Sequence, residues 1–139
     1  MADTPQEYLA AAPEAGRPWL EEFWAHVRER NPDLELAMFR STPMFRFGPS
    51  YAKDGYVTFT TAAKHFSAHA LEFDLVAETK EKIPGAYGCK GCVSVKYDNE
   101  AAKPVLKEFV DEAMRRRGFL SRRGWSGRDS VEYWGRRES

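Results

Sequence analysis

Two short motifs carry side chains that could bind a metal ion or react as nucleophiles. The segment HFSAH places His65 and His69 four residues apart, and the segment CKGC places Cys89 and Cys92 three residues apart. Imidazole nitrogens and thiolates are the usual ligands of zinc, and cysteines at the second spacing can also form a redox pair. A metal site and a redox pair are therefore alternatives to the default for a cytosolic chain, which is a set of ordinary reduced thiols.

The spacing of the histidines disfavours a shared zinc ion. Apolar and polar residues alternate from residue 64 to residue 70, which predicts a strand. His65 and His69 would then lie about 13 Å apart along the strand. Two ligands of one zinc ion each lie about 2.0–2.3 Å from the metal, so these histidines cannot share one. Cys89 and Cys92 remain the candidate thiol ligands of a metal, because Gly91 could bend the chain and turn both inward.

The polar side of this predicted strand could instead line a pocket for a small molecule. Hydroxyl, imidazole and cationic groups are the donors that fix a polar ligand. The alternative is a solvated face of a half-covered sheet. No motif holds a nucleophile beside an oriented base, and the glycines near Cys89 lack the phosphate-loop spacing, so we expect a binding protein rather than an enzyme. The candidate pocket residues are Arg46, Lys64, His65, Ser67, His69 and Lys90.

The C-terminal segment suggests a different kind of partner. Residues 115–139 hold eight arginines and three acidic residues, so the remaining chain is acidic by the same amount, because the total charge is zero. Arginine interleaved with aromatic residues suits phosphates and stacked bases, but such a tail also docks on an acidic body or on a protein partner. Nucleic acid is the weaker of these alternatives. The candidate polyanion-binding residues are Arg115, Arg116, Arg117, Arg122, Arg123 and Trp125.

Hydrophobic periodicity predicts an α+β fold. A short helix opens at Thr4, a second starts between Pro13 and Pro18 and ends at Asn31, and further helices cover residues 72–83 and 99–117. Strand-like alternation marks residues 34–40, 44–47, 56–61, 64–70 and 89–97. This order predicts an antiparallel sheet of about five strands, with the N- and C-terminal helices packed mainly on one face as a two-layer sandwich.

The totals favour one domain. A length of 139 residues suffices for a single core, which we place in residues 1–117, followed by an arginine-rich tail in residues 118–139. Charged residues make up 30% of the chain and the mean hydropathy is −0.61, which excludes a membrane protein. We see no basic segment followed by an apolar one at the N-terminus, so we expect a cytoplasmic protein.

Several motifs, in order along the chain, resemble a known family. They are PEAGRPWLEEFWAHV, TPMFRFG, YVTFTTAAKHFSAHA and the later Lys90-Gly91 strand. Together they resemble the YdhG-like proteins, a bacterial family mainly of unknown function, over roughly residues 5–117. The resemblance implies a compact α/β domain, and the two cysteines lie outside its motifs. The positions that match the family's motifs are Pro43, Phe45, Gly48, Lys64, His65, Lys90 and Gly91.

The same resemblance implies a concrete function. Some YdhG-like proteins are described as frataxin-like intracellular iron chaperones, and iron carriage of that type relies on an acidic surface. Here Glu7, Glu14, Glu21 and Glu22 could form such a surface, although helix exteriors are commonly acidic. We therefore expect a non-enzymatic binding domain with no firm cofactor, with iron handling as its most concrete version. The alternative is a nucleic-acid or protein interaction module that acts through the C-terminal tail.

Overall fold

The structure is a computed structural model that describes residues 3–118. The predicted tail positions Arg122, Arg123 and Trp125 lie outside the described residues, as does nearly all of the segment 118–139. The helices are α1 (Pro5–Ala11), α2 (Arg17–Arg30), α3 (Tyr51–Asp54), α4 (Phe73–Lys82) and α5 (Ala102–Arg116), with a 3-10 turn η1 (Glu14–Gly16) before α2. The strands are β1 (Leu36–Phe39), β2 (Thr42–Arg46), β3 (Tyr56–Thr61), β4 (His65–Ala70) and β5 (Cys92–Lys96).

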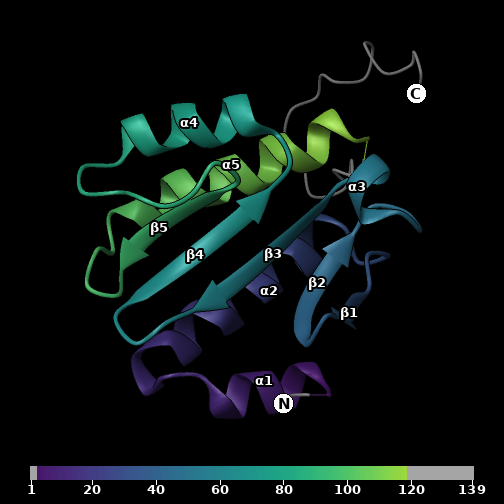
Figure 1. Ribbon diagram of the computed structural model, residues 1–139, viewed down its shortest axis with the longest axis horizontal. Helices are drawn as coiled ribbons and strands as arrows, with labels where there is room; N and C mark the ends of the chain where they lie inside the picture. The colour runs from purple at the N-terminus through teal and green to yellow at the C-terminus, as the bar shows by residue number, and fades with distance from the viewer. Residues whose placement is uncertain (1–2, 119–139) are drawn as a thin grey trace.

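The five strands form one antiparallel sheet in chain order, β1-β2-β3-β4-β5. Helix α4 follows β4 and precedes β5 in the chain. Helices α2 and α5 lie behind the sheet in the view of Figure 1. Buried residues of α2, α4 and α5 share one core cluster with inward-pointing strand residues. The predicted α+β class, with an antiparallel sheet covered by helices on one face, is confirmed. Among the described residues, no helix has the length and hydropathy that crossing a bilayer requires.

An aromatic cluster joins α2 to the centre of the sheet. The rings of Trp19 and Phe23 on α2 lie 5.0 and 4.9 Å from the ring of Phe66 on β4, centroid to centroid. Phe59 on β3 lies 5.4 Å from Phe23. Phe23, Phe59 and Phe66 are completely buried. This packing uses the three- and four-residue spacing of α2 and the two-residue spacing of β3 and β4, which is why both periods are clear in the sequence.

The chain between β1 and β3 differs from the expectation. The predicted strands end at residue 40 and resume at residue 44, but Pro43 lies inside β2 opposite Met38. The reversal occurs one step earlier, where Arg40 and Ser41 adopt left-handed backbone angles with φ of 53° and 66°. Two residues of positive φ make the hairpin turn whose twist suits antiparallel strands. A short helix, α3, follows β2 in the segment between residues 47 and 56, for which no helix was predicted.

Candidate functional site

One face of the sheet carries no helix and collects most of the candidate pocket residues. Strand residues alternate, so those between the core residues point away from the helices. We call this set the open face: Ala37 and Phe39 on β1, Thr42, Met44 and Arg46 on β2, Tyr56, Thr58 and Thr60 on β3, His65, Ser67 and His69 on β4, and Cys92, Ser94 and Lys96 on β5. Across these five strands, no open-face position is acidic.

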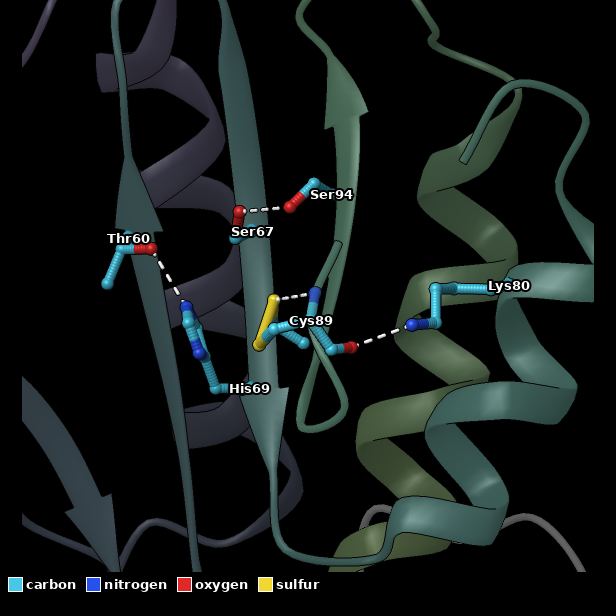
Figure 2. Close-up of a disulfide and its surroundings, with 7 residues drawn as sticks. Thr60, Ser67, His69, Lys80, Cys89 and Ser94 are labelled. Carbon is cyan, nitrogen blue, oxygen red and sulfur yellow. Dashed lines mark hydrogen bonds between the residues drawn. A yellow bond between two sulfur atoms is a disulfide. The ribbon is translucent and has the colours of Figure 1, made fainter. Parts of the chain in front are cut away.

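His69 lies in the middle of the open face, between Thr58 on β3 and Cys92 on β5, its partners in register. Its Nε2 is hydrogen-bonded to Thr60 Oγ1 at 2.9 Å (Figure 2). Burial lowers the pKa of His69, because no acidic partner offsets the cost of placing a charged ring there. The predicted pocket residue His69 is therefore a largely enclosed imidazole that favours its neutral form.

Ser67 and Ser94 form a hydroxyl pair on the next row of the same face. Their Oγ atoms lie 2.6 Å apart, and both residues are buried (Figure 2). The backbone of Ser94 also exchanges two hydrogen bonds with Tyr87, at 3.0 and 2.7 Å, so the chain before β5 runs along its outer edge. The sequence marked Ser67 as a candidate but missed Ser94 and Thr60, since only the strand register shows that they face it.

His65 and Lys64 lie at the other end of β4 from His69. His65 is opposite Lys96 on β5, and its ring meets the ring of Tyr87 edge-on at 5.5 Å between centroids. Lys64 is exposed in the turn that precedes β4. Both histidines lie on one strand, as the alternation predicted, so the strand argument against a shared zinc ligand pair applies to this structure.

Arg46 and Lys90 lie at the opposite end of the sheet from His65. Arg46 is level with Tyr56, so four residues of strand and two strand spacings separate it from Ser67, roughly 13 Å by 10 Å. It lines a hollow of about 330 Å³ that Asp33 and Glu35 also line. Lys90 Nζ lies 5.0 Å from the centroid of Phe73. The structure thus distributes the six candidate residues along the open face and its rim and does not gather them in one pocket.

Cys89 and Cys92 are joined as a disulfide, with Cα atoms 5.1 Å apart. This differs from the expected pair of reduced thiols. Cys92 is buried at the start of β5, whereas Cys89 is exposed in the loop before it. Lys80 on α4 donates a hydrogen bond from Nζ to the carbonyl oxygen of Cys89 at 2.7 Å (Figure 2). No sequence signal singles out Lys80, because the contact depends on how α4 packs beside the loop.

The four glutamates proposed for iron lie on α1, η1 and α2. Glu22 is held by Lys103 and Lys107 at 3.0 and 2.7 Å, and the hydrogen bond from Lys107 is the main cause that lowers its pKa. Glu7 accepts a hydrogen bond from the amide of Asp3 near the cap of α1. Glu14 lies in η1 and Glu21 on α2. Within residues 3–118, no three His, Cys, Asp or Glu side chains form a group that could hold a metal ion.

The described arginines of the predicted polyanion site make ion pairs with the domain itself. Arg115 and Arg116 both pair with Glu112 on α5, and Arg116 also reaches Asp74 on α4 at 3.0 Å. Arg117 pairs with the buried carboxylate of Glu72 at 2.7 Å. The remaining predicted residues of this site, Arg122, Arg123 and Trp125, lie outside the described residues.

Comparisons with known proteins identify a solved structure with a similar fold. No family model matches the chain, and no curated protein matches it. The crystal structure of YdhG from Bacillus subtilis, a protein of the DUF1801 family, is similar to this structure with a TM-score of 0.64. The match covers 84% of this chain and 92% of the other at 18% sequence identity. The chain therefore shares the fold of a DUF1801 protein, in agreement with the resemblance seen in its motifs. The frataxin-like description finds no support in these comparisons.

Proposed function

We propose that the chain is a non-enzymatic binding domain of the YdhG type, which takes a small anionic ligand on its open face. The observation that carries this proposal is the chemistry of that face. Its strand positions include cations and hydroxyls and no carboxylate, although the chain as a whole has equal numbers of acidic and basic residues. Such a surface attracts anions and does not repel them at close range.

The end of the face formed by Lys64, His65 and Lys96 is the best position for the ligand. Lys64 and Lys96 are both exposed, and the half-buried ring of His65 is directly opposite Lys96. At the other end, Asp33 and Glu35 share the hollow beside Arg46 and offset its charge. A phosphate or carboxylate group bound near Lys64 and Lys96 would meet ammonium donors without a competing carboxylate on the strands.

Calorimetric titration with inorganic pyrophosphate and with citrate tests the proposal. Lys96→Glu should weaken binding about tenfold or more, because it replaces an attraction with a repulsion at the site. Lys82→Glu makes the same change of charge on α4, at a side chain that lines the groove between α4 and α5 on the helix side, and should leave the affinity nearly unchanged. Equal losses in the two variants, or no binding by the native chain at low salt, would rule the open face out.

The iron-handling version of this proposal needs its own experiment. It requires Glu7, Glu14, Glu21 and Glu22 to act together, and the lysine partners of Glu22 compete with a metal for its carboxylate. Anaerobic titration with ferrous iron, of the native chain and of a variant with all four glutamates changed to glutamine, would test it. Binding that disappears in the variant would favour iron over the anionic ligand.

A further inference from the structure

The CKGC loop places two sulfur atoms in unequal surroundings. Cys92 is 7% exposed and is fixed as the first residue of β5, where it is paired with His69 of β4. Cys89 is exposed in the preceding loop. An incoming thiol or disulfide can therefore reach Cys89 more easily than Cys92. This asymmetry separates an attacking cysteine from a resolving one.

A backbone donor is directed at the less accessible sulfur. The amide of Cys89 donates a hydrogen bond to Cys92 Sγ at 2.8 Å. Hydrogen bonds to an anion are stronger than those to a neutral atom, so this amide would favour the thiolate form of Cys92 once the disulfide opens. The hydrogen bond thus helps the Cys92 sulfur to leave as a thiolate when the disulfide is opened.

The loop is held by contacts that do not depend on the disulfide. Lys80 Nζ holds the carbonyl oxygen of Cys89 at 2.7 Å. Gly88 has φ of 128°, and a Cβ there would lie 2.6 Å from the carbonyl oxygen of Cys92, so the close approach of the two chain segments requires glycine. Neither feature involves the sulfur atoms, so we expect both to keep the two cysteines near each other when the bond between their sulfurs is broken, as a reversible pair requires.

We infer that Cys89 and Cys92 form a thiol–disulfide exchange site, in which Cys89 attacks small-molecule disulfides and Cys92 resolves the mixed disulfide. This activity goes beyond the proposed binding of an anion and depends on different residues. Its substrates are disulfides of small thiols in one direction, and the corresponding free thiols in the other.

The two steps balance as written from the reduced protein. The Cys89 thiolate attacks one sulfur of R–S–S–R, and the S–S electron pair leaves on R–S⁻, which takes up the proton that Cys89 had released. The Cys92 thiolate then attacks Cys89 Sγ, and the second R–S⁻ leaves and takes up the proton from Cys92. Two electrons pass from the protein to the substrate, giving the protein disulfide and two molecules of R–SH.

Trapping the mixed disulfide tests this assignment. Each protein is reduced, mixed with hydroxyethyl disulfide, quenched with an alkylating agent and weighed by mass spectrometry. This uncharged substrate does not depend on the anion-binding face, so failure here leaves the proposed function standing. Cys92→Ser should accumulate a mixed disulfide at Cys89 about tenfold faster than Cys89→Ser accumulates one at Cys92, because the attacking sulfur is more accessible. The native chain should form its internal disulfide with no mixed disulfide accumulating.

A second measurement needs no substitution. The folded native chain is equilibrated with mixtures of reduced and oxidised dithiothreitol, and its free thiols are counted. Reversible opening and closing of the pair in the folded protein is expected. A disulfide that stays closed until the protein unfolds, or equal trapping rates in the two serine variants, would overturn the inference and leave a purely structural bond.

Discussion

At the scale of single residues, His69 has the most unusual environment on the open face. Its hydrogen-bond partner is the neutral hydroxyl of Thr60, and its neighbours in register are Thr58 and Cys92. None of these groups can compensate a positive charge. Burial lowers the pKa of His69 for this reason, and folding therefore favours the neutral ring.

This environment predicts a dependence of stability on pH. Because the pKa of His69 is lower in the folded state than in the unfolded state, the unfolded chain takes up the proton first as pH falls. The neutral ring contributes fully to stability above the unfolded pKa, about 6.5, and that contribution is lost as pH falls toward the folded pKa. Thermal unfolding between about pH 7.5 and pH 5.5 should show a smaller loss of Tm in His69→Gln than in the native chain. Identical losses would contradict the assignment.

The positions of His65 and His69 could be predicted from the sequence only in part. The alternation in HFSAH correctly placed His65 and His69 on one strand. It could not show that Cys92 lies beside His69, because α4 separates β4 from β5 and no local signal sets the register of these strands. HFSAH and CKGC were therefore interpreted as separate motifs, although His69 and Cys92 are neighbours on the open face.

At the scale of elements, the end of α5 is joined to the start of β3 through Arg117. Its guanidinium pairs with Glu72, which precedes α4, and donates a hydrogen bond to the carbonyl oxygen of Lys53 at 3.2 Å. Gly55, next to β3, leaves room for this side chain: a Cβ at Gly55 would lie 2.8 Å from its guanidinium. Glu72 is 8% exposed, so displacing Arg117 would leave a buried carboxylate without its cation.

A matched pair of glycine substitutions measures this contact. Gly55 and Gly85 have nearly equal positive φ angles, 87° and 85°, but no atom lies within 4 Å of a Cβ built at Gly85. Gly85→Ala should cost about 1 kcal/mol from backbone strain alone. Gly55→Ala should cost clearly more in the free energy of unfolding measured with urea, because the arginine must also move. Equal costs would mean that the Arg117 contact contributes little.

Element boundaries could be predicted where one period dominated a segment. The stripe of apolar residues on α2 and the alternation on β3 and β4 identify these elements correctly. The hairpin between β1 and β2 was misplaced, because Pro43 normally ends a strand. Its missing N–H is tolerated here, and its carbonyl oxygen accepts a hydrogen bond from Thr58 Oγ1 at 2.6 Å.

At the scale of the whole molecule, the described residues build one hydrophobic core cluster. The buried residues of the hydrophobic core cluster run from Ala12 to Met114. The boundary near residue 117 was a prediction from the loss of periodicity, and it stays one. A chain that ends at Gly118 should unfold in one cooperative transition, with a Tm within roughly 4 °C of the full chain by calorimetry. A much larger decrease would mean that residues 119–139 form part of the folded domain.

The same pair of chains tests the alternative partner class. Fluorescence anisotropy with a labelled single-stranded oligonucleotide, at low and at high salt, reports binding by arginine to phosphates. If the C-terminal tail binds nucleic acid, the full chain should bind and lose affinity steeply with salt, and the chain that ends at Gly118 should bind much more weakly. Absence of binding by the full chain at low salt would remove this alternative.

The segment around Tyr87 has a consequence for how copies of this protein meet. An antiparallel sheet has two outer strands whose free backbone groups can recruit a strand from another molecule, which is a route to aggregation. On β5, Ser94 already exchanges both of its outward hydrogen bonds with Tyr87 of the same chain, so the centre of that border is closed. Among the described strands, the other outer strand is β1, which spans only Leu36–Phe39. The segment that leads into the cysteine loop thereby also shields the centre of β5 from strand addition by another copy.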